Sequence, residues 1–111
     1  TLARRREMVT VPGLVRGAGH VSEITDNAAQ GRFEMPVEGG EVAFVLYRRD
    51  GDVVSLLHAE VPAHLNGRGL GAKLVRATLD TLDAQGAKVV PRCSFIRAWM
   101  ARHPEYDRIR G

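Results

Sequence analysis

Apolar and polar residues alternate in the first half of the chain, which is the pattern of β-strands. Phe33, Met35 and Val37 alternate with charged or proline neighbours, and this spacing predicts a half-exposed strand. Over residues 41–48 both alternating sets are apolar, as in a strand that is buried on both faces. These two segments predict neighbouring strands of one sheet.

Short connections join these strands to a third one. The segment 53–61 is again rich in apolar residues and predicts a strand. The pair Asp50-Gly51 before it is a strong hairpin signal, since a tight two-residue turn needs positive φ values that glycine and aspartate tolerate. We therefore expect an antiparallel meander of three strands.

The apolar spacing changes after residue 61 to that of an amphipathic helix. Gly86 is suited to end this helix in a left-handed conformation. The apolar face recurs at intervals of three and four residues and comprises Leu70, Leu74, Val75, Thr78, Leu79 and Leu82. The pattern predicts one long helix packed against the sheet.

A short strand and a second helix complete the predicted order. Val89 and Val90 form a buried strand that Pro91 closes, and Ser94 is placed to cap a helix. That helix carries four large apolar residues, Phe95, Ile96, Trp99 and Met100, of which we assign Trp99 and Met100 to the core. Pro104 lies just past its end, and we assign the late arginines, Arg102 among them, to the solvated surface. The order predicts an α/β fold of the α+β type. Its mixed sheet has the antiparallel meander first, then a strand–helix–strand crossover to a parallel strand and a C-terminal helix.

Composition narrows the class of protein. A chain of 111 residues with 44% hydrophobic and 26% charged residues is typical of one globular domain. No apolar run approaches the roughly 20 residues of a membrane helix, so we expect no membrane association. The single cysteine, Cys93, excludes an intramolecular disulfide and fits a reducing, cytoplasmic location.

The chain is mildly basic, with a net charge of +3. We expect residues 1–19, which hold three consecutive arginines and several glycines, to be a flexible basic arm before a domain at 20–111. The charge suits an anionic small ligand as well as a nucleic acid. The basic residues are scattered and few aromatic residues lie among them, so a small nucleic-acid-binding domain is the less favoured alternative.

The most informative segment opens the long helix and reads Asn66-Gly67-Arg68-Gly69-Leu70-Gly71-Ala72. Glycine costs up to about 1 kcal/mol relative to alanine inside a helix, so Gly69 and Gly71 in the first turn need a reason. The first amides of a helix lack carbonyl partners and attract anions, and a glycine lets a phosphate approach them. A tight turn with close packing of the helix on the sheet is the alternative. We favour the phosphate site, with Arg68 as a charged donor.

Four segments in order resemble the GCN5-related N-acetyltransferase (GNAT) superfamily, in particular its small single-domain branch. They read His58-Ala59-Glu60-Val61-Pro62, the glycine segment 66–71, Val90-Pro91-Arg92-Cys93-Ser94-Phe95 and His103-Pro104-Glu105-Tyr106. The resemblance covers about residues 21–107. Asn66 stands where the family usually has Gln or Arg, and Ala59 replaces the usual Thr.

The resemblance implies acetyl-CoA as co-substrate. Its pyrophosphate would bind the amides at 67–72, its pantetheine arm would lie beside the end of strand 53–61, and its thioester would lie where that strand and the next one splay apart. The implied cofactor-binding residues are Val61, Asn66, Gly67, Arg68, Gly69, Leu70, Gly71 and Ala72.

Three residues are candidates for catalysis. Cys93 follows a strand end at the start of the last helix, where a thiolate is favoured, and the resemblance places it beside the thioester. A buried structural thiol is an equally good interpretation. His58 and Glu60 share one face of their strand, and His58 could take a proton from an amine or from Cys93. A hydrogen-bonded core histidine is the alternative, and Glu60 more often orders a loop.

The sequence therefore predicts an acetyl-CoA-dependent N-acetyltransferase that acts on an unidentified amine, either a small molecule or a protein or peptide lysine. We expect no metal, because His58 and Cys93 are too few ligands for one. A CoA-binding module without turnover is the main alternative.

Overall fold

The structure, a computed structural model, describes residues 24–111. The predicted arm at 1–19 and the predicted domain start at residue 20 lie outside the described residues. The described strands are β1 (Thr25–Asn27), β2 (Arg32–Pro36), β3 (Val42–Asp50), β4 (Val53–Glu60) and β5 (Lys88–Pro91). The α-helices are α2 (Leu70–Ala84) and α3 (Ser94–Ala101), and three 3₁₀ segments are η3 (Glu38–Gly40), η4 (Ala63–Leu65) and η5 (Pro104–Ile109).

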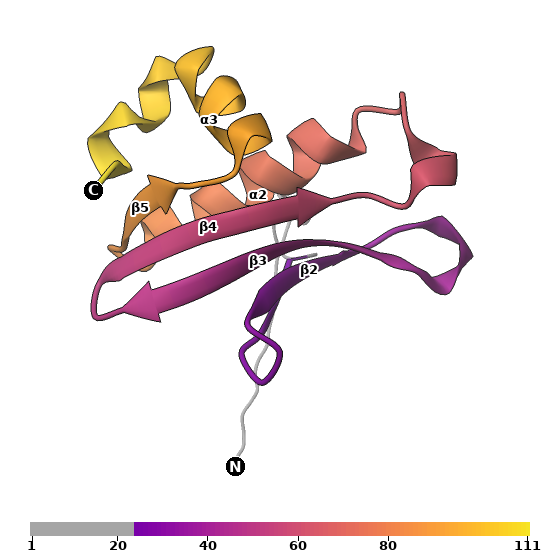
Figure 1. Ribbon diagram of the computed structural model, residues 1–111, viewed down its shortest axis with the longest axis horizontal. Helices are drawn as coiled ribbons and strands as arrows, with labels where there is room; N and C mark the ends of the chain where they lie inside the picture. The colour runs from indigo at the N-terminus through magenta and orange to yellow at the C-terminus, as the bar shows by residue number, and fades with distance from the viewer. Residues whose placement is uncertain (1–23) are drawn as a thin grey trace.

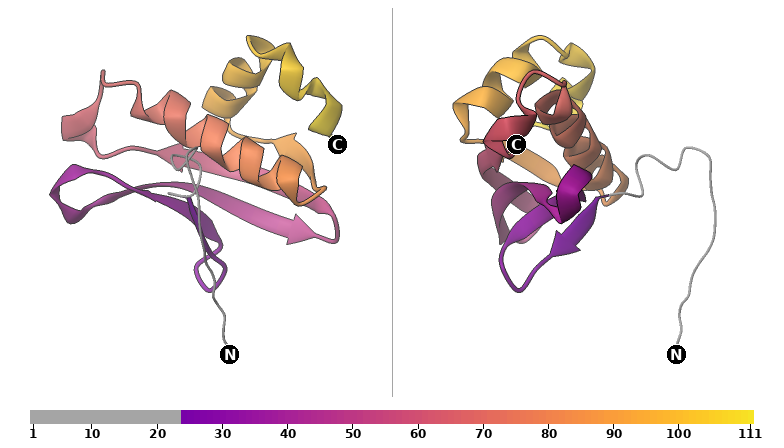
Figure 2. Two further views of the ribbon diagram at one scale, coloured as in Figure 1. Left: turned by 180° about the vertical axis from the view of Figure 1, so that it is seen from behind. Right: turned by 90° about the vertical axis from the view of Figure 1, so that its right-hand side faces the viewer.

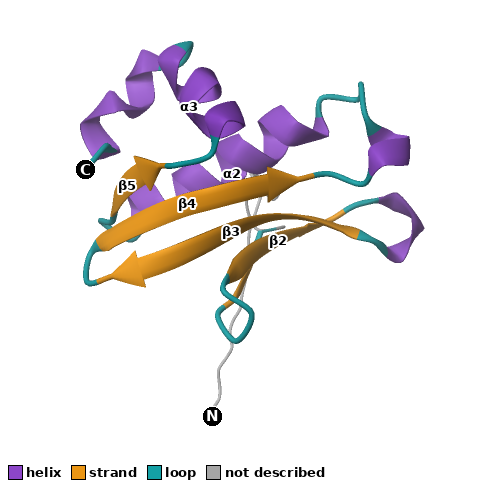
Figure 3. Ribbon diagram, viewed as in Figure 1, coloured by secondary structure: helices purple, strands orange, loops and turns teal. Residues whose placement is uncertain are grey.

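The five strands form one mixed sheet in the order β1-β2-β3-β4-β5 (Figures 1 and 3). All neighbours are antiparallel except β4 and β5, which α2 connects as a parallel pair. The predicted mixed α/β fold, with its meander and crossover, is thus confirmed. The short strand β1 was not predicted, because its three residues, Thr25 to Asn27, are all polar and offer no apolar alternation.

The hydrophobic core lies on one face of the sheet, and the view of Figure 1 shows the other face, with α2 passing behind the strands. Figure 2 shows α2 lying across the core side. In β3 only Ala43, Val45 and Tyr47 are buried, whereas Phe44 and Leu46 are half-buried on the open face. The prediction that this strand is buried on both faces is therefore wrong, because no helix of the described residues covers the second face.

The long helix matches its prediction closely. All of the predicted apolar face except Leu70 is buried, and Leu74, Leu79 and Leu82 have no exposed area. Gly86 follows the helix with a φ of 75°, and the amide of Ala87 donates to the carbonyl of Leu82 at 3.0 Å. Only glycine adopts this left-handed conformation without strain, which explains where the helix ends.

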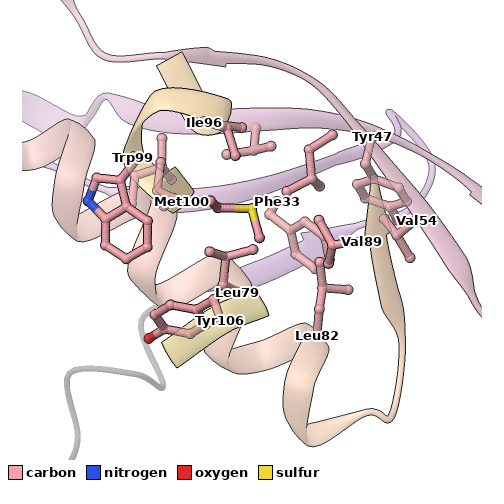
Figure 4. Packing of buried hydrophobic residues seen from close by; sticks show 14 of the residues in the cluster. Phe33, Tyr47, Val54, Leu79, Leu82, Val89, Ile96, Trp99, Met100 and Tyr106 are labelled. Carbon is pink, nitrogen blue, oxygen red and sulfur yellow. The ribbon is translucent and has the colours of Figure 1, made fainter. Parts of the chain in front are cut away.

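The C-terminal part differs from its prediction at three points. Cys93, not Ser94, is the N-cap of α3, and no side chain caps the helix. Phe95 is not part of the buried face, since 45% of it is exposed. After α3 the chain continues into η5, which buries Tyr106 and Ile109 against the same core as α2 and α3 (Figure 4).

Candidate functional site

A cavity of about 430 Å³ lies between the start of α2, the first turns of α3 and the end of β4. Its walls are mostly apolar side chains and glycine backbone. The lining residues are Ala59, Val61, Leu65, Asn66, Gly67, Gly69, Leu70, Gly71, Ala72, Phe95, Trp99 and Arg102. The cavity thus contains all of the predicted cofactor-binding residues except Arg68.

The start of α2 leaves backbone amides without helical partners. Gly69 is the N-cap with a left-handed φ of 74°, and no side chain caps the helix. The first helical hydrogen bond runs from the amide of Lys73 to the carbonyl of Gly69 at 3.1 Å. The three amides of residues 70–72 therefore precede the helical ladder, and the first turn holds no acidic residue that would repel an anion. Free amides at a helix start favour a negatively charged group, so this end of the cavity could accept one.

The three glycines of this segment have different reasons to be glycine. Gly67 and Gly69 have φ values of 85° and 74°, which other residues adopt only with strain, and nothing lies within 4 Å of a Cβ built on either. Gly69 is thus the cap before the helix, not a residue of its first turn as predicted. Gly71 is helical, and a Cβ there would lie 3.0 Å from Cζ of Phe95.

Strand β4 extends beyond its partner β5 at the cavity. The parallel pairing ends at Leu56 and Pro91, and the carbonyl of Leu56 then accepts hydrogen bonds from the amides of Arg92 at 2.8 Å and Cys93 at 3.1 Å. Residues 58–60 remain paired with β3 alone, and Leu57 is the extra residue of a β-bulge before them. The strands therefore diverge, and the side chains of Ala59 and Val61 face the cavity from the free end of β4.

The three candidate catalytic residues lie around this divergence but do not form one cluster: His58 and Glu60 are hydrogen-bonded to each other, and Cys93 stands apart from this pair. Cys93 is half-buried against the core and does not line the cavity. His58 is exposed, so it is not the core histidine of the alternative interpretation, and its Nε2 lies 3.1 Å from Oε1 of Glu60. Among residues 24–111 no hydrogen bond joins His58 to Cys93, so the structure pairs His58 with Glu60.

Arg68 differs from its predicted place beside the phosphate. Its guanidinium forms an ion pair with Glu38 of η3, and the residue does not line the cavity. The salt bridge holds the η3 turn against the loop that precedes α2. The charge of Arg68 is therefore already matched by a carboxylate.

The sequence did not predict that α3 forms one wall of the cavity. Phe95, Trp99 and Arg102 all line the cavity and follow one another at intervals of four and three residues. This spacing places them on one face of α3. Trp99 was assigned to the core and Arg102 to the surface. Trp99 is indeed only 3% exposed, but it also borders the cavity.

A polar cluster behind Trp99 ties η5 to α2. The hydroxyl of Tyr106 donates to Oδ1 of Asp80 at 2.6 Å and accepts from Arg76 at 3.1 Å. Burial, followed by the hydrogen bond to the Asp80 carboxylate, raises the pKa of Tyr106 to about 12. The Arg76 guanidinium also lies 5.2 Å from the centre of the Trp99 ring. The cluster holds the wall of the cavity in place.

Two further kinds of site are not found in the described part of the chain. No group of three or more His, Cys, Asp or Glu residues within 24–111 lies together as metal ligands would. None of the helices in this region is long and apolar enough to cross a bilayer.

Comparison with known proteins assigns the family. The model of the GCN5-related N-acetyltransferase family matches residues 32–109, which span strands β2 to β5, the helices α2 and α3, and η5. The chain therefore belongs to the GCN5-related N-acetyltransferases, a family of acetyltransferases that use acetyl-CoA. A solution structure of a GCN5-like protein from Staphylococcus aureus has the same fold, with a TM-score of 0.61. The match is 24% identical in sequence and covers 80% of this chain and 87% of that one.

Proposed function

We propose that this protein transfers an acetyl group from acetyl-CoA to an amine. One observation carries the proposal: the uncapped amides of α2 and the free end of β4 open onto the same cavity. The first element suits the phosphates of CoA, and the second offers unpaired strand backbone to its amide-containing arm. A site that bound only a nucleotide would not need the unpaired backbone at the free end of β4.

The residues of the cavity fit the donor. Acetyl-CoA supplies a thioester that is activated toward attack by an amine. The amides of residues 70–72 would hold the negative charge of the pyrophosphate. Phe95, Trp99 and Leu70 would cover the arm and exclude water from it, because their apolar surfaces line the same space.

The opposite face of β4 is where we place the acceptor. A β-bulge at Leu57 shifts the alternation along β4, so Ala59 and Val61 line the cavity while His58 and Glu60 are exposed on the other side. His58 is solvent-exposed and hydrogen-bonded to Glu60, so it can take a proton from the acceptor's ammonium group and pass it to water, which leaves the neutral amine to attack the thioester. The acceptor is an amine of a small molecule or of a protein or peptide lysine, and we place the reaction in the cytoplasm.

Cys93 is a bystander in this proposal. Direct attack of the amine on the thioester needs no thiol. Cys93 does not line the cavity, and within residues 24–111 it is not hydrogen-bonded to His58, whose partner is Glu60. We predict that Cys93→Ala retains at least half of the wild-type rate, measured as CoA release with a lysine peptide or polyamine. If Cys93 instead carries the acetyl group, incubation with acetyl-CoA alone adds one acetyl group (about 42 Da) to the intact protein. Cys93→Ala is then inactive although it is folded.

Binding and turnover are tested separately. Calorimetry with acetyl-CoA, NAD and ATP should show binding of acetyl-CoA in clear preference to the other two. Release of free thiol from acetyl-CoA is then followed with a panel of primary amines and lysine peptides. Tight binding with no thiol release for any amine would make the protein a CoA-binding module. Failure to bind acetyl-CoA at all would refute the proposal, and binding to DNA or RNA that weakens steeply with salt would favour the nucleic-acid alternative.

A further inference from the structure

We propose that Arg102 binds the 3′-phosphate of CoA, so that the protein distinguishes CoA from 3′-dephospho-CoA. This inference rests on the proposed function. It adds a residue that recognises one defined group of the donor, at the end of α3.

Among the described residues that line the cavity, Arg102 is the one that carries a charge. Its side chain forms no hydrogen bond or ion pair with any other residue of 24–111. The arginines near it are engaged: Arg76 with Tyr106 and Glu105, and Arg97 with the carbonyl of Arg92. A cation that lines a cavity without a carboxylate partner is available to an anionic ligand.

The placement of Arg102 along α3 separates it from the first anion site. Phe95 lies in the first turn of α3, with its ring against Gly71 at the start of α2. Arg102 is the C-cap of α3, seven residues later, which corresponds to about 10 Å along the helix axis. The cavity is therefore lined by amide donors beside the first turn of α3 and by an arginine at the end of that helix, with Trp99 between them on α3.

Coenzyme A carries negative charge in two places, the pyrophosphate and the phosphate on the adenosine ribose. Two anion-binding groups that line one cavity and are separated along α3 match this division of charge. Arg76 adds positive potential beside Trp99, although Glu105 lies 3.9 Å from it and offsets part of its charge. Arg102 is therefore the residue that we assign to the second phosphate.

A structural role for Arg102 is the competing explanation. A cation near the C-terminus of a helix interacts favourably with the helix dipole, and that role requires no ligand. The two explanations differ in their effect on the two forms of the donor. A merely structural arginine would change the stability of the fold and would treat CoA and 3′-dephospho-CoA alike.

The test is calorimetric binding of CoA and 3′-dephospho-CoA to wild type, Arg102→Gln and Arg102→Lys. Arg48→Gln on the open face of the sheet removes the same charge away from the cavity and serves as the control. We expect wild type and the control to bind CoA at least about tenfold more tightly than 3′-dephospho-CoA, a difference of about 1.4 kcal/mol. Arg102→Gln should lose this preference by weakening CoA alone, and Arg102→Lys should keep part of it.

Four outcomes would overturn the inference. Equal weakening of both ligands by Arg102→Gln would place the arginine at the pyrophosphate or give it a structural role. An unchanged preference in Arg102→Gln would place the 3′-phosphate elsewhere. Wild type that binds both ligands equally would refute this inference and leave the proposed function intact, whereas wild type that binds neither would refute both.

Discussion

Replacing Gly71 by alanine separates the two reasons for a glycine at the start of α2. The Cβ of the new residue would lie 3.0 Å from Cζ and 3.4 Å from Cε2 of Phe95. If Gly71 is present so that a phosphate can approach the amides, alanine should weaken CoA binding whatever occupies position 95. If it is present so that the Phe95 ring can pack there, removing the ring should cancel the effect.

The expected change in stability is small. Alanine in place of glycine in a helix stabilises it by up to about 1 kcal/mol. The Phe95 ring must retreat by a few tenths of an ångström, but it is 45% exposed and can move toward solvent. The few carbon contacts that it loses are worth about 0.1–0.2 kcal/mol each. We therefore expect the free energy of unfolding of Gly71→Ala to stay within about 1 kcal/mol of wild type, so any loss of affinity is not a loss of folding.

The assay is a double-mutant cycle of Gly71→Ala, Phe95→Ala and the double variant, with CoA affinity measured by calorimetry and stability by urea denaturation. We expect Gly71→Ala to weaken binding about tenfold, or by about 1.4 kcal/mol, in both the wild-type and the Phe95→Ala background. Gly69→Ala is an unsuitable substitute, because its φ of 74° adds about 1–2 kcal/mol of backbone strain. Full recovery of affinity in the double variant would refute the phosphate explanation for Gly71.

Two predictions concern the stability of the fold. The pKa of Tyr106 is about 12 in the folded protein and about 10 in the unfolded chain. The contribution of this residue to the free energy of unfolding is therefore complete below pH 10 and is lost as the pH rises toward 12. Urea denaturation should show that wild type loses stability over that range. Tyr106→Phe, which is already less stable than wild type at pH 8, should lose less stability as the pH rises. Equal losses in the two proteins would contradict the assignment. Leu79 is fully buried whereas Leu57 is 41% exposed on the open face. Leu79→Ala should therefore cost about 2–5 kcal/mol, with Leu57→Ala, the matched control, within about 1 kcal/mol of wild type.

The sequence predicted those elements in which the spacing of apolar residues directly indicates the buried face. Helix α2 has a complete apolar stripe and a glycine with positive φ after it, so both its existence and its end follow from local rules. Strand β1 and segment η5 lack such a signal. β1 is held through contacts distant in sequence, such as the hydrogen bond of 2.5 Å from the hydroxyl of Tyr47 to Asp26. Pro104 begins η5, which the sequence offered only as the end of the preceding helix.

The cavity shows the limit of such reasoning most clearly. Its α2 side could be predicted, because three glycines at a helix start have few physical explanations. Its α3 side could not, since the spacing of Phe95, Trp99 and Arg102 specifies a shared face but not what that face meets. That depends on how α3 packs beside α2, and the contact of Phe95 with Gly71 shows that the two helix starts lie together. The same arginine is a surface residue in the sequence and a cavity residue in the structure, so its role depends on a helix–helix arrangement that its own segment does not encode.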